Sequence, residues 1–256
     1  MMPNPFPASV TLARLTEQAA EGPWFRLHAD PPFLLTSTDA GDMGPSGRPH
    51  PLRRARVLSS MLSAYAMCDL SSADVASVSQ VHGRHIVNID GGEYPPSTDA
   101  DGIICTGDRV ASMITVADCL PIALWARGGE LRALVHSGWK GTGIVADALD
   151  VMARAHGVAP ADVYMCIGPG ISTDAYEVDA ARARLFADRF GDRAVPTERH
   201  LDLRRANVDL ALRYGVKHIT VYEDCTVTHA GLSSFRAEGP DRYRRMAAVL
   251  LPPRKI

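Results

Sequence analysis

The stretch "VADCLPIALWARGGELRALVHSGWKG", residues 116–141, contains the pattern that decides the fold. Two apolar runs, residues 121–127 and 131–137, flank the pair Gly128 and Gly129. A two-residue Gly-Gly connection is a strong hairpin signal, because the tight turns that join twisted antiparallel strands need positive φ angles. The stretch therefore predicts an antiparallel β-hairpin.

The hairpin also predicts which side chains meet. If Arg127 faces Glu130, the same register places His136 opposite Pro121, two residues from Cys119 and on the same face. Such diagonal neighbours lie about 7 to 8 Å apart at the backbone, a gap that longer side chains can close. We therefore expect Cys119 and His136 to meet, whereas a longer loop or a bulge at Pro121 would send them to opposite faces.

The rest of the chain favours an α+β fold with mixed, largely antiparallel sheets packed with helices. Between residues 75 and 137 one strand pattern follows another with no helical segment between them, which favours antiparallel or mixed pairing. Helices are expected at residues 11–20, 53–67, 141–157, 179–190 and 203–215, and further strands at 24–29, 33–38, 162–170 and 218–224. We expect one domain over residues 1–256, with a variable N-terminal portion of about residues 1–52.

Composition limits the classes of partner. The 256 residues are 46% hydrophobic and 22% charged, with a net charge of −2, so there is no basic surface typical of nucleic-acid binding. No apolar run approaches the roughly 18 residues of a membrane span, and no signal peptide is recognisable. The five cysteines are odd in number and never in a C-x-x-C pair, which indicates reduced thiols. We expect a cytoplasmic protein that binds a small polar molecule.

A cysteine that meets a histidine permits two kinds of chemistry. In the first, His136 takes the proton of Cys119, and the thiolate is a nucleophile with a pKa below the usual value of about 8.5. In the second, both side chains bind a metal ion, with His82 or His85 of "SQVHGRH" as a third ligand. Three protein ligands and one open position are typical of a catalytic zinc site. A buried thiol beside a hydrogen-bonded histidine remains the plain structural alternative.

Other polar residues near these positions are candidates for a binding site. Asp118 interrupts an apolar run directly before Cys119, where an unpaired carboxylate is costly to bury. The turn "SGWKGTG", residues 137–143, offers free backbone N–H groups and Lys140 to an anion, and Trp139 could stack on a flat ligand. Asp101 and Arg236 are further candidates, although tight turns and surface ion pairs explain such residues more often.

Several motifs in order resemble one known family. The motifs "SQVHG", "DADGIICT", "VADCLPI", "LVHSGWKGT", "CIGPGIS", "YEV", "LDLRRANVDLAL", "DCTV" and "SSFR" run through about residues 75–245. Together they are similar to the bacterial laccase-domain, or polyphenol-oxidase-type, family, whose members are also described as zinc-dependent purine nucleoside phosphorylases. The resemblance implies a single domain of mixed sheets and helices, similar to cysteine-hydrolase-like folds.

The resemblance also implies roles for residues. It makes His82, Cys119 and His136 the metal ligands, with zinc as the metal and copper as an alternative. It implies phosphorolysis of adenosine, inosine or guanosine to the base and ribose 1-phosphate, with adenosine deamination as a side activity. On this hypothesis Cys119, His136 and Asp118 are catalytic.

Lys140, Arg236 and Asp101 are expected to contribute to binding of the nucleoside and phosphate. Asp118 and Asp101 would orient the ligands or carry protons.

The sequence departs from the family pattern in places. Asp39 stands in "TSTDAGDMGPSG" where the family has an arginine, which bears on phosphate or substrate binding. Lys140 replaces the arginine of the commoner H-A-G-W-R-G motif, so a point charge stands in place of a guanidinium fork. The segment "SSFRAEGPDRYRR" is also looser than the family's F-S-Y-R-R pattern.

Other functions stay open at this point. Nine histidines without an H-x-H pair argue against a coupled copper cluster, but a single copper at a three-ligand site would fit the Irving–Williams order. A metal-free Cys/His hydrolase would use Cys119 and His136 alone. A metal-stabilised binding protein would show no turnover. The resemblance also raises an editing role that keeps wrong amino acids out of cell-wall precursors.

Overall fold

The central hairpin forms as the Gly-Gly pair predicts. The structure is a computed structural model that describes residues 5–15, 20–44, 51–65, 70–89 and 98–254. Strands β9 (Leu120–Ala126) and β10 (Arg132–Ser137) are antiparallel, and Gly128 and Gly129 have φ angles of 87° and 75°. His136 pairs with Pro121. The predicted register is therefore confirmed.

This hairpin lies inside a seven-stranded sheet. The strand order is β1-β12-β11-β9-β10-β7-β6. The pairs β11–β9, β9–β10 and β10–β7 are antiparallel, whereas the pairs β1–β12, β11–β12 and β6–β7 are parallel. The further strands are β1 (Val10–Ala13), β6 (Ile86–Ile89), β7 (Gly102–Cys105), β11 (Val163–Ile167) and β12 (His218–Tyr222).

A second sheet faces the first. Its six strands have the order β2-β3-β4-β13-β8-β5, and only the β5–β8 pair is parallel. The strands are β2 (Ala20–Gly22), β3 (Trp24–Ala29), β4 (Pro32–Thr36), β5 (Val75–Ser77), β8 (Ala111–Val116) and β13 (Met246–Leu250). Buried side chains from both sheets form one apolar cluster, which includes Leu134 and Ala123 from the larger sheet and Phe33 and Ile114 from the smaller. This cluster joins the two sheets.

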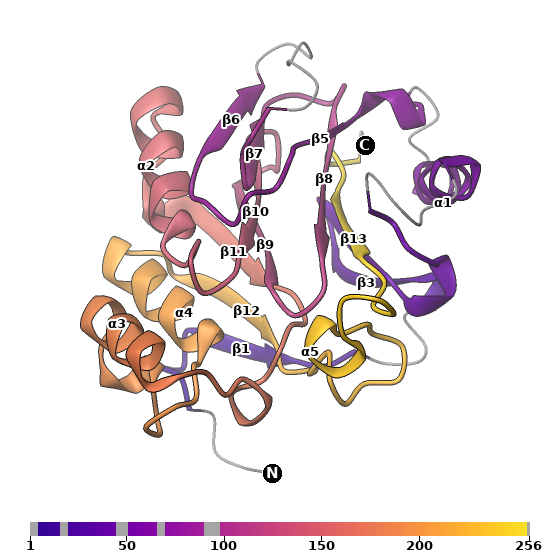
Figure 1. Ribbon diagram of the computed structural model, residues 1–256. Helices are drawn as coiled ribbons and strands as arrows, with labels where there is room; N and C mark the ends of the chain where they lie inside the picture. Colours follow the sequence, from indigo (N-terminus) through magenta and orange to yellow (C-terminus); the bar gives the residue numbers. More distant parts are fainter. Residues whose placement is uncertain (1–4, 16–19, 45–50, 66–69, 90–97, 255–256) are drawn as a thin grey trace.

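Helices cover the outer faces of both sheets, so the molecule has helical layers outside two β layers (Figure 1). Helices α2 (Ile144–His156), α3 (Ala180–Phe190) and α4 (Leu203–Tyr214) contribute to the apolar cluster of the larger sheet. Helix α1 (Pro51–Ala64) packs on the smaller sheet. The short α5 (Phe235–Glu238) follows in the C-terminal segment. The expected α+β fold with mixed, largely antiparallel sheets is confirmed.

Short 3₁₀ turns connect several of these elements. They are η2 (Thr38–Ala40), η3 (Ser72–Asp74), η4 (Pro160–Asp162), η5 (Thr173–Ala175) and η6 (Asp192–Ala194). None of the described helices combines the length and apolar character needed to cross a lipid bilayer.

The structure differs from the sequence predictions in several elements. The helix expected at residues 11–20 is wrong where the chain is described, because Val10–Ala13 form β1 and pair in parallel with β12; residues 16–19 lie outside the described part. Strand β13 was not anticipated, although "MAAVL" is a continuous apolar run between Arg245 and Leu251. Both strands take their conformation from partners far away in the chain, which local patterns do not contain.

Candidate metal centre

The turn between β8 and β9 carries Cys119. Asp118 has a φ of 85°, a left-handed conformation that is uncommon for a residue with a side chain. Its carboxylate accepts hydrogen bonds from the Thr226 hydroxyl at 2.6 Å and from the backbone N–H of Arg236 at 2.7 Å. Its carbonyl accepts a hydrogen bond from the N–H of Ile171 at 2.9 Å. These contacts satisfy the carboxylate and the carbonyl of Asp118, and they fix the turn that positions the Cys119 thiol.

His136 enters from β10 and is held by a buried carboxylate. Its side chain is 3% exposed, and its Nδ1 lies 2.8 Å from Oδ1 of Asp101, which is fully buried. The backbone N–H of His136 also donates to the carbonyl of Asp101 at 2.7 Å. Because Nδ1 is engaged by Asp101, Nε2 is the nitrogen left to act as a ligand or base.

The same carboxylate holds the loop that carries His82. The side chain of Asp101 accepts hydrogen bonds from the backbone N–H groups of Val81 at 3.2 Å, His82 at 3.0 Å and Gly83 at 2.6 Å. His82 has a φ of 59°, and these hydrogen bonds support that uncommon conformation. Asp101 therefore orients two of the predicted donors.

Two further contacts anchor this loop at its ends. The side-chain amide of Gln80 pairs with the backbone of Thr115, with distances of 2.8 Å to the carbonyl and 2.7 Å from the N–H. Arg84 forms a bidentate pair with Asp147 of α2, at 2.7 and 2.6 Å. The loop is thus tied to β8 on one side and to α2 on the other.

These supports bring three donor side chains together. The ligand atoms of His82, Cys119 and His136 all lie within 4.8 Å of one another, and the two imidazole rings meet edge to face with centroids 4.9 Å apart. The three residues are the ones that the sequence proposed. His85 is not part of this group, and its Nδ1 lies 2.9 Å from the carbonyl of Asp99.

The charges of the group are coupled. Burial alone would raise the pKa of the Cys119 thiol. The charge and hydrogen bond of His136 and the contact with His82 lower it by more, so that the pKa falls to about 6. Burial lowers the pKa of His136, and the Cys119 thiolate and Asp101 raise it, to about 9. A thiolate is also the form in which cysteine binds metals.

The donor set fits a borderline-soft metal ion. One thiolate and two imidazoles are typical ligands of zinc, and they also suit copper. Side chains within 4.8 Å of one another need only small rotations to meet on one ion, and His82 is exposed enough to rotate. Its exposure also leaves one side of the group open to a reactant.

The residues expected to bind substrate lie in different settings. Lys140 is exposed, with Nζ 5.7 Å from the centre of the Trp139 ring. The guanidinium of Arg236 lies over Tyr176, 5.3 Å from the ring centre, and donates to the carbonyl of Glu177 at 2.8 Å. Asp101 has no exposed surface. Its surroundings favour orientation of the histidines over direct contact with a substrate, and both Asp118 oxygens are engaged in holding the turn.

Two residues near the centre were not singled out from the sequence. Burial and the charge of Cys119 raise the pKa of Tyr176, and the charges of Arg182 and Arg236 partly oppose this. Arg182 also lies over the Trp139 ring at 4.5 Å. The motif "YEV" contained the signal for Tyr176, whereas Arg182 belongs to an ordinary helical pattern.

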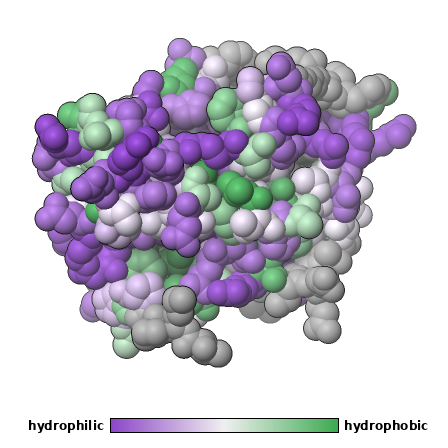
Figure 2. All heavy atoms as spheres, turned by 60° about the horizontal axis from the view of Figure 1, so that its bottom comes forward, coloured by the Kyte–Doolittle hydropathy of each residue, from purple (hydrophilic) through white to green (hydrophobic). Residues whose placement is uncertain are grey.

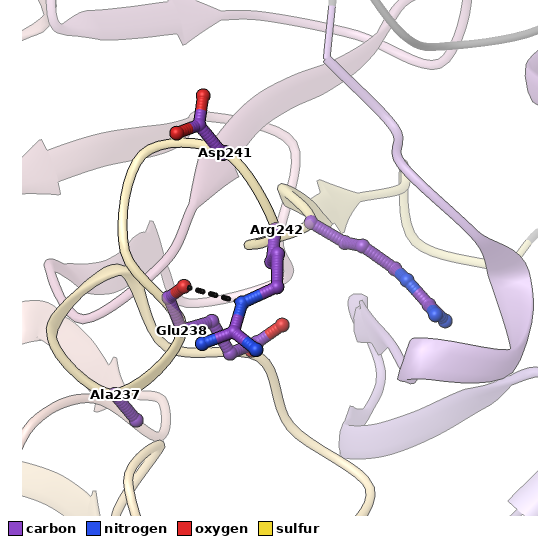
Figure 3. Close-up of a pocket in the computed structure, with 5 residues that line it drawn as sticks. Ala237, Glu238, Asp241 and Arg242 are labelled. Carbon is purple, nitrogen blue, oxygen red and sulfur yellow. Dashed lines mark hydrogen bonds between the residues drawn. The ribbon is translucent and has the colours of Figure 1, made fainter.

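A cavity of about 640 Å³ lies beside α5 (Figure 3). It is lined by Ala237, Glu238, Asp241, Arg242 and Arg244. Arg242 points towards Glu238 and donates to its carbonyl at 3.3 Å. The cavity contains none of the three donors. The lining residues follow Arg236 directly in the chain, and the backbone N–H of Arg236 donates to the carboxylate of Asp118.

The loop that contains Thr38 and Asp39 is contacted by arginine side chains from other segments of the chain. Asp39 is exposed. The guanidinium of Arg53 donates to its carbonyl at 2.6 Å, and that of Arg244 donates to the carbonyl of Thr38 at 3.2 Å. Two guanidinium groups therefore donate to backbone carbonyls of this loop.

The lower part of the molecule in Figure 1, with α3 and α5, turns forward in Figure 2. There a small group of hydrophobic residues is surrounded by hydrophilic side chains. Phe235 of α5 is 48% exposed, and Val81, beside His82, is 52% exposed.

The two sheets and the three convergent donors define an α+β protein with a candidate metal centre of one sulfur and two nitrogen ligands. The chain belongs to the family described as multi-copper polyphenol oxidoreductase laccase, which it matches over residues 53–252.

Related proteins of this family are named for another activity. The chain is 28% identical over 218 residues to a purine nucleoside phosphorylase of Deinococcus radiodurans, covering 84% of this chain and 82% of that protein. It is 33% identical over 172 residues to a purine nucleoside phosphorylase of Mycobacterium tuberculosis, covering 65% of this chain and 68% of that protein.

Solved structures share the fold. The crystal structure of YlmD from Geobacillus stearothermophilus has a TM-score of 0.81 at 24% identity, covering 94% of this chain and all of that one. The hypothetical protein YfiH from Bacillus licheniformis has a TM-score of 0.78 at 21% identity, covering 90% of this chain and 97% of that one. At these identities the likeness concerns the fold.

Proposed function

We propose that this protein is a zinc-dependent purine nucleoside phosphorylase with an adenosine deaminase side activity. It would convert adenosine, inosine or guanosine and phosphate into the free base and ribose 1-phosphate. The observation that carries the proposal is the convergence of His82, Cys119 and His136 within 4.8 Å. The names of the relatives from Deinococcus radiodurans and Mycobacterium tuberculosis support the substrate class.

Zinc is the proposed metal because two imidazoles and a thiolate with an open side match catalytic zinc sites. When bound, such an ion supplies Lewis-acid polarisation and lowers the pKa of a coordinated water. His82, Cys119 and His136 would hold it. A single copper ion is the alternative, since copper binds such ligands more tightly than zinc.

The surrounding residues have separate tasks in this proposal. Asp101 keeps the proton of His136 on Nδ1, so that Nε2 stays directed at the centre. Asp118 holds the turn of Cys119 against α5 and Thr226. Lys140 and Arg236 bind the phosphate and nucleoside from the exposed side.

The family description does not require a coupled copper cluster in this chain. Such clusters need many histidines, typically in H-x-H pairs, and the sequence has nine histidines and no such pair. Within the described residues, one group of three or more His, Cys, Asp or Glu side chains is arranged for a metal ion. A multi-copper oxidase is therefore not the activity that we propose.

A second candidate function has one observation in its favour. Asp101, His136 and Cys119 lie in the order acid, base and nucleophile, with a thiol pKa of about 6, as in cysteine hydrolases. That mechanism gives no role to His82, whose strained backbone is held beside the thiol. The convergence of a third donor therefore favours the metal enzyme.

The test is metal analysis of the wild type and Cys119→Ala, each assayed with adenosine in the presence and absence of phosphate. We expect about one metal ion per wild-type chain, ribose 1-phosphate only when phosphate is present, and loss of metal and turnover in Cys119→Ala. Cys225→Ala serves as a control that removes a thiol outside the group.

The products separate the alternatives. Inosine formed without phosphate indicates deamination. Wild-type turnover that persists after complete removal of metal, and stops on thiol alkylation, would overturn the proposal in favour of the hydrolase. A tightly bound metal without turnover of any nucleoside would indicate a binding protein.

A further inference from the structure

Trp139 carries two cations beside the candidate metal centre. The guanidinium carbon of Arg182 lies 4.5 Å from the centre of the indole ring, and Nζ of Lys140 lies 5.7 Å from it. Arg182 comes from α3, whereas Lys140 follows Trp139 directly. The Trp139 ring thus contacts two cationic side chains from separate segments of the chain.

The indole is tied closely to the metal ligands. Gly138, the preceding residue, has so little space beside it that an added Cβ would lie 2.7 Å from Sγ of Cys119. Gly138 in turn follows His136 by only two residues. Trp139 and its cations therefore belong to the segment that leaves the candidate centre, directly after a residue that packs against Cys119.

A third cation lies over a second aromatic side chain. Arg236 stacks over Tyr176 at 5.3 Å. Burial and the charges of Cys119 and Asp118 raise the pKa of Tyr176, and the charges of Arg182 and Arg236 partly lower it.

These cations are poorly balanced by carboxylates. Among the described residues, Arg182 has an ion pair with Asp179 at 3.6 Å, and Asp179 is 60% exposed and also caps α3. The nearby Glu177 pairs with Arg199 at 3.1 Å. In the same described part of the chain, neither the ammonium group of Lys140 nor the guanidinium group of Arg236 forms an ion pair with a carboxylate, although the backbone N–H of Arg236 donates to Asp118. These two charged groups remain available to an anion.

The stacked geometry suits an oxyanion. A guanidinium that lies on the face of an aromatic ring keeps its N–H groups at its own edge, where they can donate to oxygen atoms. Two N–H groups of one arginine match two oxygens of a phosphate. Lys140 adds a mobile point charge that can reach the same anion.

We propose that Arg182, stacked on Trp139 and assisted by Lys140, forms the inorganic phosphate subsite of this centre, with Arg236 at its far side. The proposal rests on the proposed phosphorolytic function and names the residue that supplies the guanidinium fork. It assigns a binding role to Arg182, which the sequence motifs did not indicate.

The experiment measures binding of inorganic phosphate to the metal-loaded full chain by equilibrium dialysis. We expect Arg182→Ala to weaken phosphate binding about 10-fold, the loss of roughly one charge-assisted hydrogen-bonded contact. Arg184→Ala is the matched control, because Arg184 is an exposed arginine on the same helix. It should bind phosphate like the wild type.

Two further variants separate charge from packing. Arg182→Met keeps an apolar side chain against Trp139 and removes the charge, so it should behave like Arg182→Ala. Arg182→Lys keeps the charge without the fork and should lose less affinity. If Arg182→Met binds phosphate as tightly as the wild type does, Arg182 only packs on the indole, and the proposal is overturned.

Kinetics distinguish this inference from the proposed function. In an active phosphorylase, Arg182→Ala should raise the KM for phosphate about 10-fold while the KM for the nucleoside stays near the wild-type value. Phosphorolysis with an unchanged KM for phosphate would sink the subsite and leave the function standing. Arg182-dependent phosphate binding without any phosphorolysis would sink the function and leave the subsite standing.

Discussion

Nδ1 of His136 lies 2.8 Å from Oδ1 of Asp101, and both side chains are buried. The same carboxylate accepts three backbone hydrogen bonds from residues 81–83. Burial raises the pKa of Asp101, but the hydrogen bonds from His136 and from Gly83 lower it by more. One ionised group therefore fixes the orientation of His136 and the backbone of His82 at once.

Asp101→Asn should weaken metal binding about 10- to 100-fold, the effect that loss of a ligand's orienting partner has in other metal sites. The amide has one acceptor oxygen and places N–H donors against the N–H groups of residues 81–83. Chelator competition with zinc measures the affinity. Asp99→Asn, an exposed neighbour, is the control, and an equal affinity in the two variants would contradict the role of Asp101.

The two histidines of "SQVHGRH" should behave differently. His82→Ala removes a donor that lies within 4.8 Å of Cys119 and His136, so bound metal should fall well below one ion per chain. His85→Ala should retain the metal, because His85 contacts the carbonyl of Asp99 instead. Metal content by mass spectrometry of the purified proteins decides this. Loss of metal in both variants would indicate a loop effect and not ligation.

Part of this site could be predicted from the sequence because it depends on local geometry. Gly128 and Gly129 set the turn, and the turn sets the register that brings Cys119 and His136 to one face. The alternation of the strands fixed which side chains point together. The hairpin thus contained two of the three donors before any tertiary contact was known.

The rest depends on packing that the sequence does not display. The place of His82 follows from hydrogen bonds to a buried carboxylate in another segment, so only the family resemblance selected it over His85. Arg182 comes to Trp139 because α3 packs on the larger sheet. Likewise Val10–Ala13 become a strand only because β12 offers a free edge.

Gly138→Ala should weaken metal binding at the centre by steric crowding alone. An added Cβ would lie 2.7 Å from Sγ of Cys119, so the sulfur must move away from the two imidazoles. We expect a loss of zinc affinity of at least about 10-fold, the scale of a positioning defect, with little change in secondary structure by circular dichroism. Gly83→Ala is the matched control, since its Cβ would lie 3.5 Å from Asp101. Equal zinc affinities in both variants would contradict the proposed geometry.

Asp42 should make the stability of the C-terminal strand depend on pH. Its carboxylate accepts hydrogen bonds from Nε and Nη2 of Arg245, both at 3.2 Å, and from the backbone N–H groups of Arg245 and Gly44. Burial raises the pKa of Asp42, and these contacts lower it by more, to below its ordinary value.

A depressed pKa in the folded state means that the ionised form favours folding. The stabilisation is therefore complete above the unfolded pKa of about 3.9 and is lost as the pH falls through the lower folded value. Asp42→Asn should reduce the free energy of unfolding by about 1 to 3 kcal/mol at pH 7, and by less near pH 2, because protonation of the wild-type carboxyl removes part of its stabilisation there. Urea unfolding at both pH values, with the exposed Asp188→Asn as control, measures the difference. The same loss at both pH values would show that Asp42 stabilises by shape and not by charge.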